Sequence, residues 1–383
     1  MKEYSKKSNL KISTIPNGVI LPRKETKDGP MWGLGGVCDE DGNFVETSFY
    51  DGGWATHGGK YDWDISEEVY QDDTVVYMGM FFQHWGHFLV DLVGRLWFTL
   101  RSEFQSENMK IAYLGELEPE GNFLEFFRLL GISEGQLIHI KNPTRFKRVI
   151  VPDNSSKSCE WFSQEYIDIF KVITENALKS TELNRLKELK NIYFTRVNFK
   201  KAKGTEFGEK LIIQCMNAEN NRLIAPEQLT LSEQIYIWNH AEKIVCMNGT
   251  IPLNLIFSQN QNLKLIVLNK TSIEHENLLF FSRMKNIEAE FVNVYIEPFR
   301  NYPKSLGAGP FLLTVTDELK SYLKTSGIRC PVTDFRLTWS NICNFFKYCF
   351  CITGIKSKVH LWLSKIVPQN WKNTVRKILR LGK

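Results

Sequence analysis

The sequence predicts an α/β protein of two domains, each built on a mostly parallel sheet covered by helices. Its 383 residues suffice for two domains of ordinary size with their own cores. Strand-like and helix-like segments alternate along most of the chain, which is typical of parallel sheets. A charged segment near residue 180 interrupts this alternation. We therefore expect domains at 1–180 and 181–305, followed by a helical tail at 306–383.

The first domain is expected to begin irregularly and then become regular. Residues 1–73 are rich in Gly, Asp and aromatic residues with little periodicity, which predicts short strands and loops. A β-branched strand at 73–80 runs directly into a helical segment at 81–100. The expected elements that follow are strands 110–114, 136–140 and 147–151 and helices 122–130 and 161–178.

The second domain has the clearer pattern. Strands are expected at 191–195, 222–225, 243–247 and 263–268, and helices between them at 206–217, 231–241 and 251–258. This order is typical of a doubly wound, Rossmann-like domain, in which ligands bind beyond the carboxyl ends of the strands. No repeat of 20 to 50 residues is visible, which argues against a solenoid.

The charge of the chain is unevenly distributed. The whole chain carries +5, whereas residues 335–383 contain ten Lys and Arg and no Asp or Glu, so residues 1–334 carry −5. In the last predicted helix, Trp371, Val375, Ile378 and Leu379 form an apolar stripe among basic residues. This pattern predicts a tail that lies on an anionic membrane surface. The alternative is a basic helix that packs across the body of the protein.

Several classes of protein are disfavoured by composition. No run of 18 uncharged apolar residues is present, and the charged N-terminus is not followed by an apolar stretch, so neither a membrane span nor an export signal is expected. Cysteine spacing gives no zinc pattern. The acidic body disfavours nucleic acid as a partner. We expect a cytoplasmic protein, peripheral on the inner face of the cell membrane.

The strongest candidate site lies on the segment after the first clear strand. His84, His87, Asp91 and Arg95 are spaced by three and four residues, which places them on one helix face. A carboxylate beside an imidazole can deprotonate a hydroxyl, so one interpretation is catalytic. A second makes His84, His87 and Asp91 metal ligands. A third is structural, with an Asp91–Arg95 ion pair and histidines satisfied by their surroundings.

A second candidate is the basic loop after strand 191–195. Arg196, Lys200 and Lys203 precede a helix there. Cationic side chains and free amides at a helix N-terminus suit a diphosphate. A solvated basic loop is the alternative.

A third candidate is the turn between strand 243–247 and the next helix. It contains Asn248, Gly249 and Thr250, where a phosphate could meet backbone amides, although ordinary αβ packing uses the same residue types. Two carboxylates lie nearby in the sequence. Glu227 follows a strand and is placed to accept hydrogen bonds from ribose hydroxyls. Glu233 is a further nucleotide-binding candidate, or it completes a capping box with Thr230.

Four blocks, taken together, resemble a known family. They are HWGHFLVDLVGRLW (84–97), YFTR (193–196), APEQLTLSEQ (225–234) and NGTIPLNLIF (248–257). Their order and approximate spacing resemble glycosyltransferase family 61, in particular bacterial capsular-polysaccharide biosynthesis proteins of the DUF563 type. The resemblance covers about residues 74–270.

The resemblance implies a GT-B architecture of two Rossmann-like domains facing across a cleft. It implies an inverting transfer that requires no metal, with a nucleoside diphosphate sugar as donor and a glycan or lipid-linked oligosaccharide as acceptor. Asp91 or His87 would then be the base on the acceptor hydroxyl and Arg95 would position charge. Arg196, Lys203 or Lys200, and the Gly249–Thr250 turn would stabilise the departing diphosphate.

The expected function is sugar transfer to a growing bacterial surface glycan, capsule or lipopolysaccharide. Two other hypotheses stay open at the level of sequence. One is a catalytically silent scaffold that binds a glycan or nucleotide. The other is a metal-dependent hydrolase built on the histidine segment.

Overall fold

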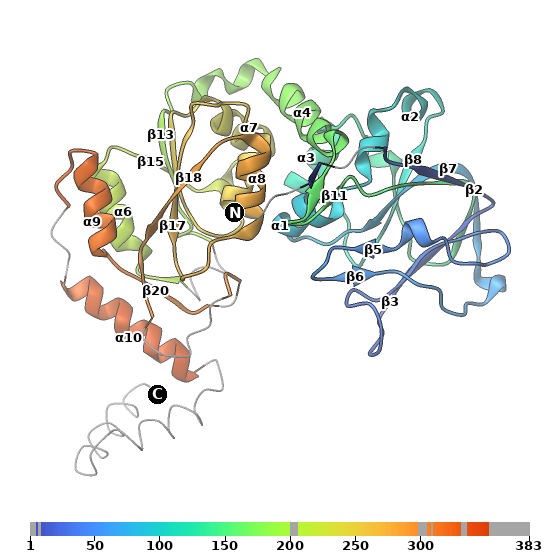
Figure 1. Cartoon of the computed structure of the whole chain (residues 1–383), viewed down its shortest axis with the longest axis horizontal. Helices are drawn as coiled ribbons and strands as arrows, with labels where there is room; N and C mark the ends of the chain where they lie inside the picture. Colours follow the sequence, from blue (N-terminus) through green and yellow to red (C-terminus); the bar gives the residue numbers. More distant parts are fainter. Residues whose placement is uncertain are drawn as a thin grey trace, which may run out of the picture.

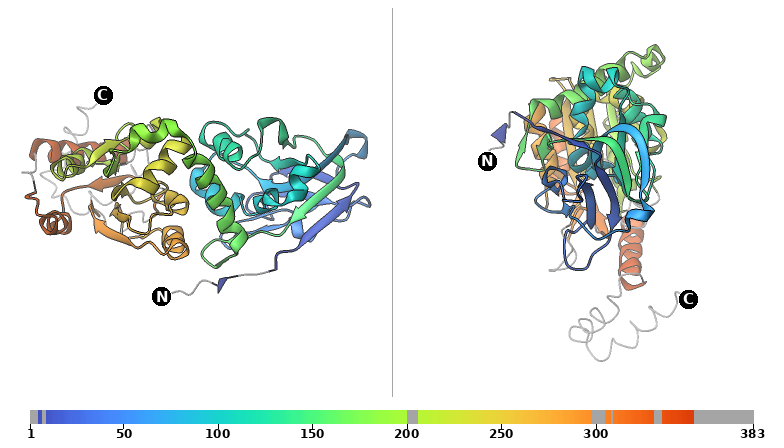
Figure 2. Two further views of the ribbon diagram at one scale, coloured as in Figure 1. Left: turned by 90° about the horizontal axis from the view of Figure 1, so that it is seen from above. Right: turned by 90° about the vertical axis from the view of Figure 1, so that its right-hand side faces the viewer.

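The protein is an α/β molecule of two lobes that lie side by side (Figure 1). This computed structural model describes residues 5–6, 9–199, 206–297, 305–307, 309–330 and 335–351. Helix α4 (Gln164–Leu178) lies where the lobes meet, and the view from above shows the same side-by-side arrangement (Figure 2). In the sequence, the strands of the first lobe's larger sheet precede α4, and the strands of the second lobe's larger sheet follow it.

The first lobe contains a mixed sheet of seven strands in the order β4-β3-β10-β7-β8-β9, with β2 also paired to β10. Its bounds are β2 (Ile12–Pro16), β3 (Val19–Lys24), β4 (Leu34–Cys38), β7 (Val69–Met80), β8 (Lys110–Leu114), β9 (Leu137–His139) and β10 (Thr144–Pro152). Strands β7 to β10 run parallel, whereas β2, β3 and β4 pair antiparallel. The irregular N-terminal region thus completes this sheet, because Val19, Ile20 and Leu21 are buried in it.

The second lobe contains a five-stranded sheet in the order β15-β13-β16-β17-β18, with every pair parallel. Its strands are β13 (Asn191–Phe194), β15 (Arg222–Ile224), β16 (Lys243–Met247), β17 (Lys264–Asn269) and β18 (Ala289–Asn293). The helices of this lobe include α6 (Glu209–Ala218), α7 (Leu231–His240) and α8 (Glu276–Lys285). The strand order reverses between β13 and β16, and ligands bind at such a reversal in doubly wound sheets.

Smaller elements complete the two lobes. The remaining strands are β1 (Ser5–Lys6), β5 (Tyr50–Asp51), β6 (Thr56–His57), β11 (Ser156–Lys157), β12 (Trp161–Phe162), β14 (Glu206–Phe207), β19 (Tyr295–Ile296) and β20 (Phe311–Leu313). The remaining helices are α1 (Trp85–His87), α2 (Ser102–Ser106), α3 (Asn122–Leu129), α9 (Asp317–Thr325) and α10 (Phe335–Cys351). Short 3-10 turns lie at 46–48, 65–67, 134–136, 181–186 and 226–228, and a longer one at 251–257.

The two lobes share one continuous apolar core. The ring centroids of Phe88 and Phe126 in the first lobe lie 4.8 Å apart, and those of Phe126 and Phe170 of α4 lie 6.1 Å apart. Phe170 in turn packs on Phe257 of the second lobe at 5.4 Å. All four side chains are buried. This chain of edge-to-face rings fixes the relative position of the lobes.

The segment predicted as one helix at 81–100 is instead broken into three. It forms α1, a π-helical turn at Phe88–Leu92 and a 3-10 helix at Leu96–Leu100. The wider π turn is supported from outside, because the Tyr166 hydroxyl donates to the Leu89 carbonyl at 2.6 Å. The prediction of a single face carrying both His84 and Arg95 is therefore wrong, since the break rotates Arg95 away.

The described part of the C-terminal tail packs on the second lobe. Phe345 and Cys349 of α10 are buried in a core with Phe311, whereas Trp339 is 59% exposed. The predicted stripe of Trp371, Val375, Ile378 and Leu379 lies outside the described residues. Within the part of the chain that the structure describes, no helix is both long and apolar enough to cross a membrane.

Candidate active site between the lobes

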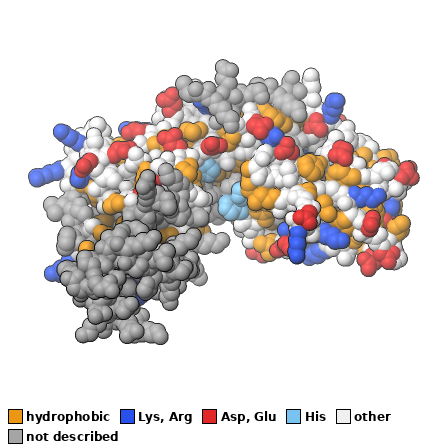
Figure 3. Space-filling model, turned by 60° about the horizontal axis from the view of Figure 1, so that its bottom comes forward, with side chains coloured by type: hydrophobic (Ala, Val, Ile, Leu, Met, Phe, Trp, Pro, Cys, Tyr) orange, Lys and Arg blue, Asp and Glu red, His pale blue; other side chains and the backbone are white. Residues whose placement is uncertain are grey.

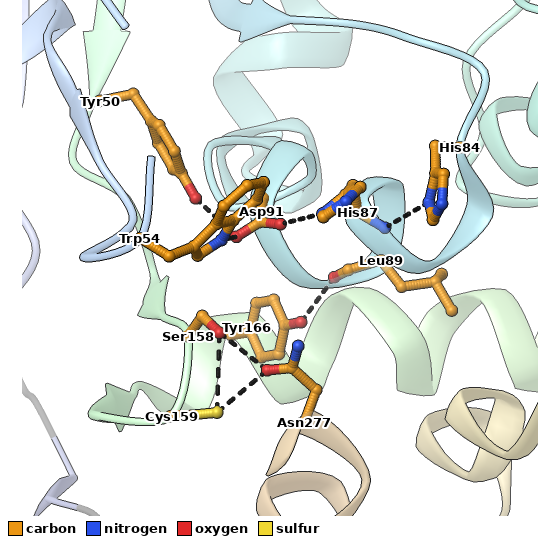
Figure 4. A network of polar contacts seen from close by, with 10 residues as sticks. All are labelled: Tyr50, Trp54, His84, His87, Leu89, Asp91, Ser158, Cys159, Tyr166 and Asn277. Carbon is orange, nitrogen blue, oxygen red and sulfur yellow. Dashed lines mark hydrogen bonds and ion pairs between the residues drawn. The ribbon is translucent and has the colours of Figure 1, made fainter. Parts of the chain in front are cut away.

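An imidazole and a buried carboxylate form the centre of the first lobe's part of the candidate active site (Figure 4). His87 Nδ1 lies 2.9 Å from Asp91 Oδ2. The Asp91 side chain is 1% exposed and the His87 side chain 35% exposed. An ionised carboxylate only accepts hydrogen bonds, so Nδ1 carries the proton and Nε2 of a neutral His87 is left as the basic nitrogen. The partly exposed imidazole can therefore take a proton from a bound hydroxyl.

Two residues of the irregular N-terminal region complete the surroundings of Asp91. The Tyr50 hydroxyl and the Trp54 indole N–H both donate to Asp91 Oδ1, at 2.7 and 3.3 Å (Figure 4). Burial and the Asp91 charge raise the pKa of Tyr50, so its hydroxyl keeps its proton and donates. Three donors thus hold a buried carboxylate, which fixes the orientation of His87.

The first lobe approaches the second through the residues around Gly86. A β-carbon on Gly86 would lie 3.3 Å from Leu253 Cδ1 and 3.5 Å from Thr250 Cγ2. The neighbouring Trp85 indole donates to Asn254 Oδ1 at 2.7 Å. His84 begins this helix by accepting from the His87 backbone N–H at 3.4 Å. Glycine permits this close contact, which brings the histidines beside the Thr250 turn.

The second lobe contributes positive charge at the carboxyl ends of its strands. Arg196 follows β13 and Lys270 follows β17, and both pair with the carboxylate of Glu206. The distance from Arg196 Nε to Glu206 Oε2 is 3.3 Å, and that from Lys270 Nζ to Glu206 Oε1 is 2.7 Å. A β-carbon on Gly249 would lie 3.4 Å from an Arg196 nitrogen and 3.8 Å from Lys270 Nζ. The Lys270 pKa is lowered, mainly by burial. Two cations therefore flank the glycine turn that follows β16.

The loop that carries Arg196 is held by a buried carboxylate. Glu209, in the first turn of α6, accepts from the Tyr193 and Thr195 hydroxyls at 2.9 Å and from the Arg196 backbone N–H at 2.7 Å. Burial raises the Glu209 pKa. Gly208, with φ of 114°, lets α6 begin against the Leu313 carbonyl. These contacts fix the position of the Arg196 backbone, from which its side chain extends.

Asn248 ties the turn after β16 to the next loop. Its amide donates to Asn269 Oδ1 at 2.8 Å and to the Ile273 carbonyl at 3.0 Å. Among the described residues, buried Asn248 Oδ1 has no hydrogen-bond partner, nor has the buried Thr271 hydroxyl. Buried polar atoms are normally satisfied, so unpaired ones at this edge favour a polar ligand.

The surroundings of His275 indicate that the first-lobe histidines and the second-lobe cations face the same region. Burial lowers its pKa to about 4, and the positive charge of Lys270, or of His87 and His84 when they are protonated, acts in the same direction. His87 and His84 belong to the first lobe, and Lys270 belongs to the second. In the space-filling view, histidine side chains are visible in the notch between the lobes (Figure 3). We call this region the interlobe site; it comprises His84, His87, Asp91, Arg196, Gly249, Thr250, Lys270 and His275.

Comparison with known families identifies a family for the central part of the chain. Residues 85–267 match the family model described as Glycosyltransferase 61, which spans α1 through β17. This part of the chain belongs to glycosyltransferase family 61. Its class of reaction is therefore glycosyl transfer. No curated protein matches the chain.

One predicted site residue of this glycosyltransferase lies away from the interlobe site. Arg95 is 2% exposed, and it donates to the carbonyls of Pro152, Thr47 and Phe49 at 2.9 to 3.0 Å. Its guanidinium also lies over the Tyr77 ring. The structure thus contains neither the predicted Asp91–Arg95 contact nor an Arg95 directed at substrate. This arginine joins the N-terminal region to the sheet.

The remaining predicted residues of the second lobe are dispersed. Glu233 completes the capping box with Thr230, as the structural alternative predicts, and also pairs with Arg185. Glu227 is exposed in the turn after β15. Lys200 and Lys203 lie outside the described residues.

The metal-ligand interpretation is not matched by the donor arrangement. In the described ranges, no group of three or more His, Cys, Asp and Glu side chains has the arrangement of a metal site. Asp91 is directed at Tyr50, Trp54 and His87, and His84 Nδ1 at a backbone N–H.

Five residues in or next to the interlobe site were not predicted from the sequence. They are Tyr50, Trp54, Glu206, Lys270 and His275. Lys270 had a detectable signal, because a lysine directly after a buried parallel strand stands at the ligand-binding edge. The other four come from segments without periodicity or far from their partners in the sequence, and no local pattern identifies them.

Proposed function

We propose that this glycosyltransferase moves a sugar from a nucleoside diphosphate sugar to an acceptor hydroxyl at the interlobe site. The observation that carries the proposal is the pairing of a His87–Asp91 dyad from one lobe with two cations beside a glycine turn on the other. A proton acceptor on one side and an anion-binding edge on the other suit a displacement with a diphosphate leaving group.

The donor diphosphate binds at the carboxyl edge of the second sheet. Arg196 and Lys270 supply charge, and the Gly249–Thr250 turn supplies close backbone approach. Glu206 keeps both cations in place before the donor arrives. Unpaired buried polar atoms of Asn248 and Thr271 at the same edge support this placement. In this scheme these side chains take up the charge of the leaving diphosphate.

The acceptor hydroxyl reacts from the side of the first lobe. His87 Nε2 takes the hydroxyl proton while the acceptor oxygen forms a bond to the anomeric carbon. The bond from that carbon to the diphosphate oxygen breaks, and the electron pair leaves with the diphosphate. Asp91 stabilises the imidazolium that results. One displacement of this kind inverts the anomeric configuration, and the two facing lobes would form a GT-B arrangement.

The setting of the reaction is also part of the proposal. We propose that the acceptor is a growing bacterial surface glycan, capsule or lipopolysaccharide, presented at the inner face of the membrane. The motif resemblance and the basic composition of residues 335–383 support this setting. The basic segment would keep the enzyme beside a lipid-linked acceptor through attraction to anionic lipids.

The experiment combines binding and turnover. Titration calorimetry against UDP, GDP, dTDP and ADP identifies the nucleotide, and the matching sugar nucleotides are then incubated with an oligosaccharide acceptor panel. We expect one nucleotide to bind and its sugar to be transferred with inversion. Asp91→Asn should abolish transfer while leaving nucleotide binding unchanged. Nucleotide binding without turnover on any acceptor would favour the silent scaffold, and binding of no nucleotide would contradict the proposal.

A further inference from the structure

An exposed indole lies directly beside the His87–Asp91 dyad. Trp54 is 45% exposed and sits in the turn between β5 and β6. Gly53 has φ of 76°, and its N–H donates to Asp51 Oδ1 at 2.8 Å, so the turn that presents the indole is hydrogen-bonded. Trp54 lies before the residues matched by the family model.

The ring is held rigidly on three sides. It stacks on the His87 imidazole, with ring centroids 4.7 Å apart and an interplanar angle of 25°. It also packs against Trp32 at an interplanar angle of 78°, with ring centroids 5.2 Å apart. Trp32 in turn stacks on Tyr50 at 5.2 Å. The indole N–H is directed at Asp91. The aromatic surface is therefore pre-organised, and little side-chain entropy remains to be lost when a ligand covers it.

This combination of surfaces suits a particular ligand chemistry. Exposed apolar surface beside polar groups marks a binding site. A sugar ring has an apolar C–H face and hydroxyls at its edge, so it can cover the indole and direct a hydroxyl at the imidazole. In the space-filling view, hydrophobic side chains of the first lobe border the histidines in the notch (Figure 3).

We propose that Trp54 is the platform on which the acceptor sugar ring lies, with its reacting hydroxyl at His87. This inference rests on the proposed function, and it assigns a carbohydrate subsite to the first lobe. The donor is held by the second lobe, where Arg196 and Lys270 lie. Trp54 therefore determines acceptor affinity and not nucleotide affinity.

The test measures each ligand separately. Saturation-transfer NMR is recorded with methyl glycosides of glucose, galactose, mannose, xylose and rhamnose, and nucleotide affinity is measured by calorimetry. Trp54→Ala should weaken saturation transfer to the preferred glycoside about fivefold, whereas Trp54→Phe retains most of it. Trp339→Ala removes a more exposed indole, from α10, and should change neither the saturation transfer to the glycoside nor the nucleotide affinity.

The outcomes separate this inference from the proposed function. Absence of saturation transfer to every glycoside, or undiminished transfer in Trp54→Ala, would overturn the inference that Trp54 is the acceptor platform. Either result would do so even if the nucleotide still binds. Loss of nucleotide affinity in Trp54→Ala would assign the ring to the donor and also overturn it. Glycoside contact that depends on Trp54 in a chain that binds no nucleotide would contradict only the proposed transfer. Thermal melting of each variant checks that the fold is retained.

Discussion

The first lobe brings imidazoles, a buried carboxylate and indoles to the interlobe site, whereas the second brings a lysine, an arginine and a glycine turn. The first set lies on irregular backbone, namely a π-helical turn and a short hairpin. The second lies at the ends of regular parallel strands. Proton transfer needs a few groups in exact mutual orientation, and anion binding needs positive charge at an accessible edge. Each lobe has the backbone suited to its part.

The largest expected effect comes from breaking the first lobe's dyad. His87→Ala should lower the rate of sugar transfer about 10²- to 10⁴-fold, because the variant loses the imidazole that takes the proton. Nucleotide affinity should stay within twofold, since the cations are untouched. A variant that loses transfer and nucleotide binding together would show that the two lobes do not divide the chemistry. Initial-rate kinetics and calorimetry on the same preparation give both values.

The next effect comes from the second lobe's cations. Lys270→Met should weaken nucleoside diphosphate binding about tenfold to a hundredfold, because a charged contact is lost and Glu206 keeps only Arg196. Lys264→Met is the matched control, since Lys264 is exposed at the opposite end of the same strand. Equal affinities of the two variants in calorimetry would remove Lys270 from the donor site.

A smaller effect is expected where the lobes are joined. Glu125 of α3 accepts from the backbone N–H groups of Leu231 and Ser232, at 2.7 and 2.9 Å, at the start of α7. Glu125→Ala should lower the free energy of unfolding by about 1–2 kcal/mol, because two amides lose a charged acceptor. Glu134→Ala removes an exposed carboxylate from a surface ion pair with Arg128. This control should change the free energy of unfolding by less than about 0.5 kcal/mol. Urea denaturation distinguishes them.

The smallest effect at neutral pH concerns acid sensitivity of the first lobe. Burial, with the charges of Arg95 and Arg23, lowers the pKa of His57 from 6.5 to about 3. Between these pH values the unfolded chain binds the extra proton, so stability falls as the pH falls through this window. In His57→Gln the decline in urea midpoint from pH 7 to pH 4 should be shallower. An unchanged slope would show that His57 does not titrate this way.

The sequence predicted regular elements well because their signals are local. Strands 110–114 and 243–247 have the bounds expected from β-branched content and alternation with helices. The expectation of a single helix at 81–100 is wrong, because the segment is broken at a π turn. In this turn the Leu89 carbonyl accepts a hydrogen bond from Tyr166, which lies far along the chain. Periodicity cannot register a hydrogen bond between segments 77 residues apart.

The candidate site divides in the same way. The spacing of His84, His87 and Asp91 predicted that they meet, because neighbours within one helical turn are close whatever surrounds them. Arg95 shared that spacing but lies elsewhere, because the backbone between it and Asp91 is not α-helical. Trp54 and Lys270 could not be paired with their partners, which are 37 and 64 residues away.

The sequence by itself determined the α/β class, most strand positions, the His87–Asp91 pair and the uneven charge, since each depends on residue type and short spacing. Only the tertiary structure decided that a tryptophan of the irregular N-terminal region stacks on the imidazole, that Glu206 links two cations, and that the two sets share one site. Such contacts depend on how distant segments pack, and a shared aromatic core fixes that packing.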